Sequence, residues 1–280
     1  MTLSLAQLAP EEHQSEGLGS FIRHHLANSN EWNLPFIGHV HLPTFEPITL
    51  FGMQVDLSIT LHVVMLWIAS LFIVLAFWLT FRKPNPVPRG LAAVLESIVL
   101  FVRDEIAIPN MGEKHGKQMT PFLSTLFFFI LVLNLMGLIP LFSTATGNIS
   151  VTAGLAVITF IMTQVNGMRE NGVFGYLKSL VPHGVPVFLF PIMIPIEILG
   201  LFTKPFALAV RLFANMTAGH TVIFALLGLI AVLATLFVSP FSIGFALFIN
   251  LLELLIAFIQ AYIFTVLSAL FIGMAMHPQH

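Results

Sequence analysis

Cysteine is absent from this chain of 280 residues, and charged residues are scarce. The lack of cysteine excludes disulfide bonds and thiolate metal sites, although it does not indicate a compartment. Asp, Glu, Lys and Arg together make up 9% of the residues, against about 25% in typical soluble domains. Hydrophobic residues make up 57%, and Phe alone contributes 28 residues. This balance indicates an integral membrane protein.

Other signals are missing as well. The first residues, MTLSLAQLAP, carry no basic segment and are followed by the polar stretch EEHQSEG, so we expect no cleaved signal peptide. No glycine-rich loop of the Walker type is present, so we expect no nucleotide site. His39 and His41 are close in sequence, but no Cys or acidic cluster completes a metal site. We therefore expect no metal, no cofactor and no nucleic-acid partner.

Five apolar segments are long enough to cross a membrane, which takes about 20 residues of helix. They lie at 61–81, 121–142, 149–167, 184–236 and 240–276. The sequence thus predicts an all-α integral membrane protein with five crossings. Residues 1–56 are expected to form an extracytoplasmic arm with at most a short hairpin around Phe51 and Gly52, and residues 57–280 the membrane domain.

A helix lying along the membrane surface is predicted at about 89–108. Apolar residues recur there at helical spacing, while Glu96, Arg103 and Asp104 fall elsewhere on the helical wheel. Eight of the eleven Lys and Arg residues lie in the segments after the first and third crossings. By the positive-inside rule these segments face the cytoplasm, so the N-terminus is expected outside and the C-terminus inside.

The last two crossings are longer than a bilayer requires. About 45 residues of helix measure roughly 67 Å, whereas the hydrocarbon core is about 30 Å thick. These helices must therefore tilt steeply or break. The final helix has no proline between Pro240 and Pro278, which favours strong tilt, while Pro205 can bend the preceding helix.

Arg211 lies at the centre of the apolar run 184–238, in which Glu197 and Lys204 are the only other charged residues. Roughly 40 Å of helix separates Arg211 from either end of the run, too far for its side chain to reach water. A guanidinium in hydrocarbon costs at least about 2.5 kcal/mol and stays charged. Arg211 must therefore meet an anion or line a wet cavity. An internal ion pair that locks helices together is one interpretation, and an ion or proton pathway is the one that we favour.

Helical spacing sorts the polar residues of this run into two faces. Glu197, Lys204 and Arg211 are each seven residues apart, so they share one stripe, with Asn215 beside it. Lys204 is expected to pair with Glu197. His220 is nine residues from Arg211 and so lies about 180° around the helix.

On the final helix, Asn250, Glu253 and Gln260 are spaced three and seven apart and are expected on one face. Folding the last two helices into a hairpin puts His220 and Glu253 within about two turns of each other in height. The two could share a proton, since a carboxylate and an imidazole are costly at membrane depth. Asn215, Asn250 and Gln260 fit such a path, and equally fit polar contacts between packed helices worth about 0.6 kcal/mol each.

Three segments resemble subunit a of the F-type ATP synthases. The segment KPFALAVRLFANMTAGH, from Lys204 to His220, is similar to that family's signature, and NLMGLIP at 134–140 is similar to its second-span motif. The final helix, with Glu253, Gln260 and the stretch AYIF, resembles the family too. In well-known bacterial members the position of His220 is acidic and that of Glu253 is His, so the two residue types are exchanged here.

The resemblance implies a non-catalytic stator subunit in a bacterial inner membrane, facing a ring of c subunits and contacting the peripheral-stalk b subunits. Arg211 would favour the ionised form of each passing ring carboxylate and block a direct leak between two offset half-channels. The half-channels would be formed by His220, Glu253, Asn215, Asn250 and Gln260 on the external side and by Glu197 on the internal side.

Two other classes of protein remain open. A self-contained secondary transporter could bind an anionic substrate at Arg211, but such folds show inverted repeats, and the first half of the chain has no second Arg-bearing counterpart. A purely structural membrane anchor would tolerate loss of Arg211. The choice between H⁺ and Na⁺ depends on ring residues outside this chain.

Overall fold

The computed structural model describes residues 31–34, 38–44, 48–50, 53–55, 58–82, 88–139, 142–179, 187–233 and 239–277. From residue 58 onward, the described elements are all helical. Five helical segments are long and apolar enough to cross a membrane. The all-α membrane class and the predicted number of crossings are therefore confirmed.

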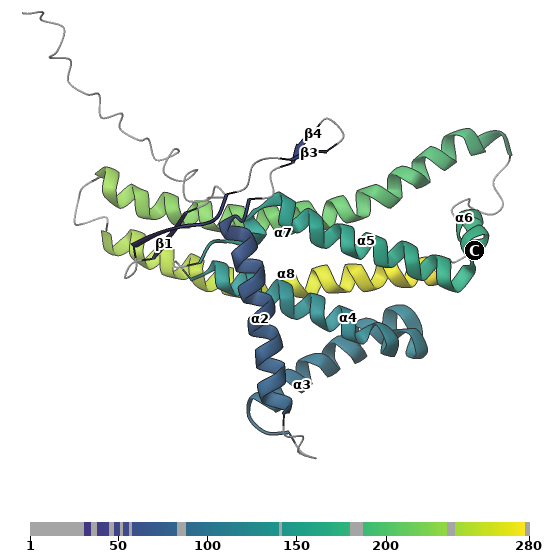
Figure 1. Ribbon diagram of the computed structural model, residues 1–280, viewed down its shortest axis with the longest axis horizontal. Helices are drawn as coiled ribbons and strands as arrows, with labels where there is room; N and C mark the ends of the chain where they lie inside the picture. Colours follow the sequence, from purple (N-terminus) through teal and green to yellow (C-terminus); the bar gives the residue numbers. More distant parts are fainter. Residues whose placement is uncertain are drawn as a thin grey trace, which may run out of the picture.

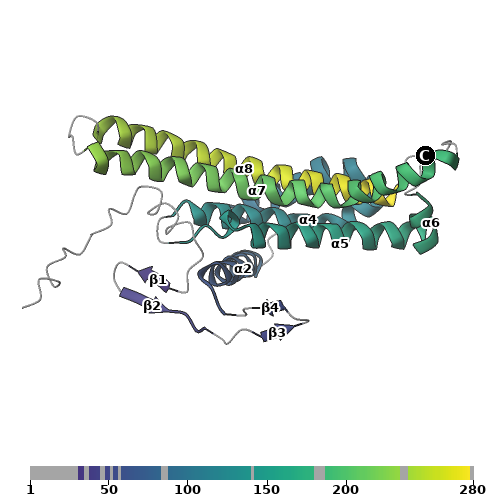
Figure 2. The ribbon, with the colours of Figure 1, turned by 90° about the horizontal axis from the view of Figure 1, so that it is seen from above.

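The long helices are α2 (Leu61–Phe81), α4 (Ile108–Gly137), α5 (Ile149–Asn171), α7 (Phe190–Leu233) and α8 (Ser239–Met276). The short ones are α3 (Leu91–Phe101), the π-helical η2 (Val102–Ala107), α6 (Val173–Ser179) and the 3₁₀ turns η3 (Ala145–Gly147) and η4 (Val187–Leu189). The helices α5, α7 and α8 run side by side, and α2 stands across them (Figure 1). Seen from above, α2 is viewed end-on beside this layer (Figure 2).

The hairpin of α7 and α8 is strongly tilted relative to α2. With 21 residues, α2 measures about 31 Å, so it matches the hydrocarbon core only if it stands nearly upright. The helices that cross it, α7 and α8, have 44 and 38 residues. Helix α7 continues through Pro195 and Pro205 and bends in its N-terminal half (Figure 1). Tilt, and not a break, therefore fits these long helices into the bilayer.

The predicted surface helix at 89–108 is the first arm of a helical hairpin. Helix α3 and η2 run into the start of α4, and the chain reverses at Gly112, which has a positive φ of 76° that glycine adopts without strain. The reversal is tight, since a Cβ at Gly116 would lie 2.7 Å from the backbone of Ile108. The apolar side of this arm packs against α4 and α8, with Val102 and Ile106 fully buried.

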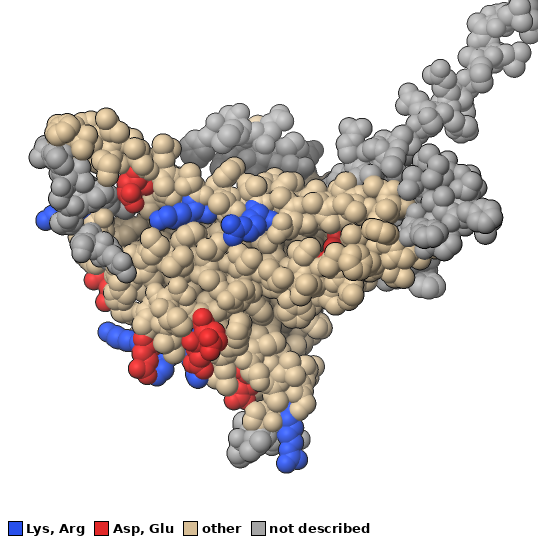
Figure 3. Space-filling model, turned by 180° about the vertical axis from the view of Figure 1, so that it is seen from behind, with Lys and Arg blue, Asp and Glu red and all other residues tan. Residues whose placement is uncertain are grey.

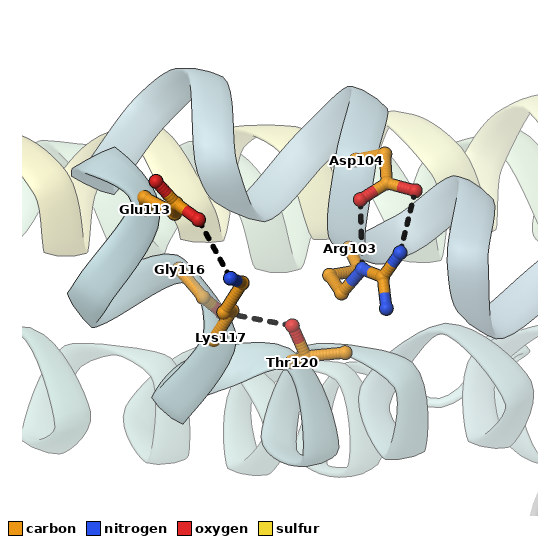
Figure 4. A network of polar contacts seen from close by, with 6 residues as sticks. All are labelled: Arg103, Asp104, Glu113, Gly116, Lys117 and Thr120. Atoms are coloured by element: carbon orange, nitrogen blue, oxygen red, sulfur yellow. Dashed lines mark hydrogen bonds and ion pairs between the residues drawn. The ribbon is translucent and has the colours of Figure 1, made fainter.

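The second crossing helix begins and ends earlier than the predicted range of 121–142. The polar residues after the reversal are helical, and Glu113 and Lys117, one turn apart, form an exposed ion pair of 2.7 Å on this segment (Figure 4). Thr120 likewise donates to the carbonyl of Gly116. The helix ends at Gly137, three residues before Pro140, which cannot continue a helix. The other long helices differ from their predicted ranges by at most six residues at either end, the largest difference being at the start of α7.

The described part of the N-terminal arm contains two antiparallel hairpins. The strands β3 (Ile48–Leu50) and β4 (Met53–Val55) form the hairpin expected around Phe51 and Gly52, although the turn itself lies outside the described residues. A second hairpin, of β1 (Glu31–Leu34) and β2 (Gly38–His41), was not predicted. Trp32 on β1 packs against a cluster of buried residues from α2, α4 and η3.

The core lies where α4, α5, α7 and α8 meet. Its fully buried side chains include Leu123 and Ile130 on α4, Leu212 on α7, and Phe264 and Ile272 on α8. A second cluster joins α2 to α4 and η3 through Met65, Ala69, Leu133, Met136 and Ala145. The two clusters hold η3 and the middle of α7 at fixed positions, which sets the geometry of the polar groups between them.

Candidate ion-translocation site

Arg211 lies on the outer side of α7. Its side chain is exposed, whereas the neighbouring Leu208 and Leu212 are buried in the core. Among the residues described, no hydrogen bond or ion pair involves its guanidinium. The interpretation of Arg211 as part of an internal ion pair therefore finds no partner in this part of the chain. The guanidinium is open to an anion that approaches from outside the subunit.

The surface around Arg211 is apolar. Seen from behind, the side on which α7 and α8 lie is broad and carries few charged side chains (Figure 3). On α8 the exposed residues Leu251, Leu255 and Ile259 recur every four positions and so line one face. An exposed apolar surface of this extent is typical of contact with lipid or with another membrane subunit.

His220 and Glu253 meet on the inner side of the same hairpin. The Nδ1 atom of His220 lies 3.6 Å from Oε1 of Glu253, with only 11% and 7% of the two side chains exposed. The expectation that folding the hairpin brings these residues together in height is thus met by the geometry. A buried carboxyl group and a buried imidazole at this separation can exchange a proton after a small rotation or through one bridging water.

Two backbone carbonyls fix the ring of His220. Its Nδ1 lies 3.0 Å from the carbonyl oxygen of Met216, and its Nε2 lies 2.9 Å from that of Gly137. The hydroxyl of Thr144 lies 2.8 Å from the same Nε2. Both ring nitrogens therefore face acceptors, and an imidazolium can donate from each of them. This arrangement suits a residue that holds a proton for part of a cycle.

Gly219 allows Glu253 to approach α7 closely. A Cβ atom at position 219 would collide with Oε1 of Glu253 and would lie 2.8 Å from its Cδ. Glycine within a helix is unfavourable by about 1 kcal/mol relative to alanine, so it needs a packing reason. The contact with Glu253 supplies that reason.

Asn215 and Gln260 form the next polar contact along the hairpin. The side-chain amide of Asn215 donates to Oε1 of Gln260 at 2.7 Å, and Gln260 is almost fully buried. A cavity of about 350 Å³, lined by both residues and by Gly219, lies beside them. Asn250 does not join this group, because its side chain is exposed while Glu253 is buried. Asn250 lies three residues before Glu253 on the same side of α8, but it is nearer the outer edge of that face, where its side chain is exposed.

A larger cavity of about 770 Å³ lies on the opposite side of Arg211, between α5, α6, α7 and α8. Its polar lining includes Glu197, Lys204, Gln164, Tyr176 and Ser179. Tyr176 donates a hydrogen bond of 2.9 Å to Gln164, and burial raises the pKa of its hydroxyl, so it stays protonated at neutral pH. The cavity extends to His277 at the end of α8. It therefore reaches from the half-buried Glu197 to the C-terminal end of the last helix.

Lys204 does not pair with Glu197. Its ammonium group lies 5.7 Å from the centre of the Phe271 ring on α8, a cation–π geometry. No ion pair joins it to a carboxylate within the described ranges. Glu197 is thus left as a carboxyl group that lines the large cavity.

Three residues of the site were not expected from the sequence: Thr144, Gly219 and Asn134. Asn134 is fully buried on α4 and points its amide toward the carbonyl of Ala257, 3.5 Å away, one turn from Glu253. Asn134 could have been predicted from its place in the segment NLMGLIP, and Gly219 from its position directly before His220. Thr144 lies in an uncharged link and had no signal, because only the folded chain brings it to His220.

Comparison with known proteins relates most of the chain to one family. The family model described as ATP synthase A chain matches residues 63–273. The ATP synthase subunit a of Chloroherpeton thalassium is 51% identical over 263 residues, which cover 92% of this chain and 77% of that protein. The ATP synthase subunit a of Myxococcus xanthus is 55% identical over 228 residues, or 80% and 75% of the two chains. The ATP synthase subunit a 2 of Chlorobium luteolum is 47% identical over 279 residues, or 98% and 80%.

Proposed function

This chain belongs to the ATP synthase A chain family, and from that premise we propose that it is the stator that carries protons to and from a rotating c-ring. It is a membrane-sector subunit of an ATP synthase. The proposal assigns the ATP chemistry to other subunits and assigns to this chain the coupling of ion flow to rotation. The observation that carries the proposal is the exposed Arg211 on an apolar helix face, with no partner among the residues described.

Arg211 faces the ring in this proposal. A ring carboxyl group must be protonated while it faces lipid, because a charged group there is very costly. When it reaches Arg211, the guanidinium stabilises the carboxylate, and the proton leaves. Arginine suits this role because it does not lose its own proton when desolvated, as lysine can. Arg211 thus also prevents protons from passing directly between the two half-channels.

The external half-channel runs through His220 and Glu253 and continues along Asn215 and Gln260. The pair is 3.6 Å apart, and the Asn215–Gln260 contact lies about two turns along α8 from Glu253, toward the level of Arg211. A proton on Glu253 would therefore be handed to the ring surface beside the cavity of about 350 Å³. Asn250, exposed about one turn before Glu253 on α8, is proposed for the outer part of the same path.

The internal half-channel is the cavity of about 770 Å³. It is polar where Glu197, Gln164 and Tyr176 line it, and it extends to the C-terminal end of α8. With the N-terminus outside and the C-terminus in the cytoplasm of a bacterial cell, this cavity opens to the cytoplasm. Each proton that crosses 100 mV delivers about 2.3 kcal/mol, so several per turn can drive ATP synthesis in the complex. The same complex supplies the other proposed partners, the c-ring and the peripheral-stalk b subunits.

The test is ATP-driven proton pumping by inverted vesicles that contain the whole complex. Arg211→Ala and Arg211→Lys are expected to abolish pumping while the complex still assembles. Arg103→Ala is the matched control, because Arg103 pairs with Asp104 at 2.7 Å on the surface and should leave pumping intact. Full pumping by Arg211→Ala would overturn the proposal. Comparing how this ATP-driven pumping depends on Na⁺ and on H⁺ identifies the ion that the complex transports.

A self-contained secondary transporter is the second candidate. It would also place an anion at Arg211, but the anion would be a soluble substrate. Purification separates the two functions, because the stator is expected to co-purify with the ring and the transporter to bind substrate alone. The family assignment favours the stator.

A further inference from the structure

We propose that His62 and Asn148 form the outermost stage of the external proton path and pass protons to His220 through the link 144–148. This inference rests on the proposed stator function. His62 and Asn148 lie outside the segments on which that function was argued. His62 is on α2, and Asn148 is the residue just before α5. Together they would deliver protons from the outer water to the pair of His220 and Glu253.

His62 is a buried titratable residue whose polar partner among the described residues is Asn148. Only 3% of its side chain is exposed, although it lies at the second position of α2, which begins at the side of the membrane proposed as external. Its Nδ1 lies 3.2 Å from the amide nitrogen of Asn148. Burying an imidazole is costly unless its polar atoms are paired, so its presence here calls for a role.

Asn148 sets the state of this imidazole. Its side-chain oxygen is used as the N-cap of α5, where it accepts a hydrogen bond of 2.8 Å from the backbone of Ser150. Its amide nitrogen is therefore the atom that faces His62, and it donates. Nδ1 of His62 must then accept, which makes the resting imidazole neutral, with its proton on Nε2. A neutral imidazole can take up a proton.

When Nδ1 of His62 takes up a proton, it becomes a donor, and it then faces the amide nitrogen of Asn148, which is also a donor. The bond to Asn148 then breaks, and the charged ring becomes free to turn and release one proton inward. After release the ring is neutral again and the bond to Asn148 can re-form. One proton enters from the outer water, one leaves toward the link, and no other reactant is needed.

The link 144–148 connects the two histidines. At one end the hydroxyl of Thr144 contacts His220, and at the other end Asn148 contacts His62. The link is compact, because the backbones of Gly147 and Asn148 donate to the carbonyls of Thr144 and Ala145 at 3.0 Å and 3.1 Å. A segment of five residues thus spans the distance between polar groups from α2 and α7.

Two hydroxyl groups lie along this link. Thr146 Oγ1 and Thr217 Oγ1 are both buried and have no hydrogen-bond partner among the described residues. Thr217 is one turn before His220 on α7, and its hydroxyl lies 3.9 Å from where a Cβ of Gly147 would be. Buried hydroxyls in native proteins are satisfied, commonly by ordered water. These two groups are therefore suited to hold a water that carries a proton from His62 toward His220.

A purely structural role is the competing explanation, in which the contact only fastens α2 to the rest of the subunit. His62→Gln separates the two roles, because a glutamine oxygen can accept from Asn148 but cannot carry a proton. His62→Ala removes both functions and leaves space that free imidazole can fill. Met65→Ala is the matched control, since Met65 is fully buried one turn away on α2 and packs in the cluster that fastens this helix.

The experiment measures ATP synthesis by the whole complex in inverted vesicles, driven by an imposed electrical potential at equal pH on both sides. We expect His62→Gln to assemble normally and to lower the rate roughly tenfold or more. We expect His62→Ala to lose activity and to regain at least half of it in buffered imidazole. Met65→Ala should not respond to imidazole, and the parent complex in the same imidazole corrects for any general effect.

Three results would overturn the inference: full activity of His62→Gln, no recovery of His62→Ala in imidazole, or failure of both variants to assemble. The last would assign His62 to structure alone. The stator proposal is tested separately by Arg211→Ala in the same vesicles. If Arg211→Ala is inactive while His62→Gln is fully active, only the inference about His62 fails.

Discussion

Gly219 on α7 and Glu253 on α8 are in such close contact that a side chain at position 219 would occupy the place of the carboxylate. The contact holds Glu253 beside His220, at 3.6 Å, and buries both residues. The position of the carboxyl group therefore depends on the absence of a single Cβ atom.

Gly219→Ala is expected to lower ATP-driven proton pumping on the order of 100-fold, because it displaces the carboxyl group of Glu253 by about the size of one methyl group. The measurement is pumping by inverted vesicles, normalised to the amount of assembled complex. Gly200→Ala is the control, since nothing lies within 4 Å of a Cβ at Gly200 in the same helix. Equal activity of the two variants would show that the contact with Glu253 has no part in transport.

Exchanging His220 and Glu253 is expected to preserve their pairing. His220→Glu alone places two carboxyl groups together and Glu253→His alone places two imidazoles together, so each single variant should pump poorly. The double variant restores one of each type. Because the two side chains are in contact, we expect a coupling of about 0.5–3 kcal/mol in a double-mutant cycle on the pumping rate. Additive losses in the double variant would contradict this prediction.

Asn215 and Gln260 are expected to be weakly coupled. Asn215→Ala removes the donor of a 2.7 Å hydrogen bond and leaves the buried oxygen of Gln260 without it. Hydrogen bonds between membrane helices average about 0.6 kcal/mol, so each single variant should slow pumping roughly threefold. The double variant Asn215→Ala with Gln260→Ala should be little worse than either single variant. A loss equal to the product of the two would mean that they act independently.

Gly167→Val is expected to destabilise the subunit by about 1–3 kcal/mol. A Cβ at Gly167 would lie 2.6 Å from the ring of Tyr176 and 3.1 Å from the Cβ of Ala275, so α5, α6 and α8 would have to move apart. Resistance of the purified complex to heat and to protease measures the change. Gly154→Val on the same helix is the control, because a Cβ there meets nothing within 4 Å. Equal resistance of the two variants would rule out tight packing at Gly167.

The sequence alone was sufficient for the class, the five crossings and the position of Arg211. These features depend on composition, on the length of apolar runs and on the rotation of about 100° per residue around a helix axis. All of these are local properties. The same rules placed His220 opposite Arg211 and at the height of Glu253. The large tilt of α7 and α8 was also predictable, because their length exceeds the thickness of the bilayer.

Local rules failed where a contact crosses between helices. The polar residues before Pro121 were expected outside the second crossing helix, but the reversal at Gly112 packs them against η2 and makes them the first turns of α4. Lys204 was expected to meet Glu197 on its own helix, and it lies instead over Phe271 of α8. In each case the competing partner is brought close only by folding.

What the amino-acid sequence determined by itself is which residues this protein places in the membrane and around which faces of its helices they lie. What only the tertiary structure decided is which of those faces meet: the carboxyl group of Glu253 against Gly219, Thr144 against His220, and His62 against Asn148. The physical reason is that helical periodicity defines angles about a single axis, whereas the distance between two axes depends on the packing of small and large side chains far apart in the chain.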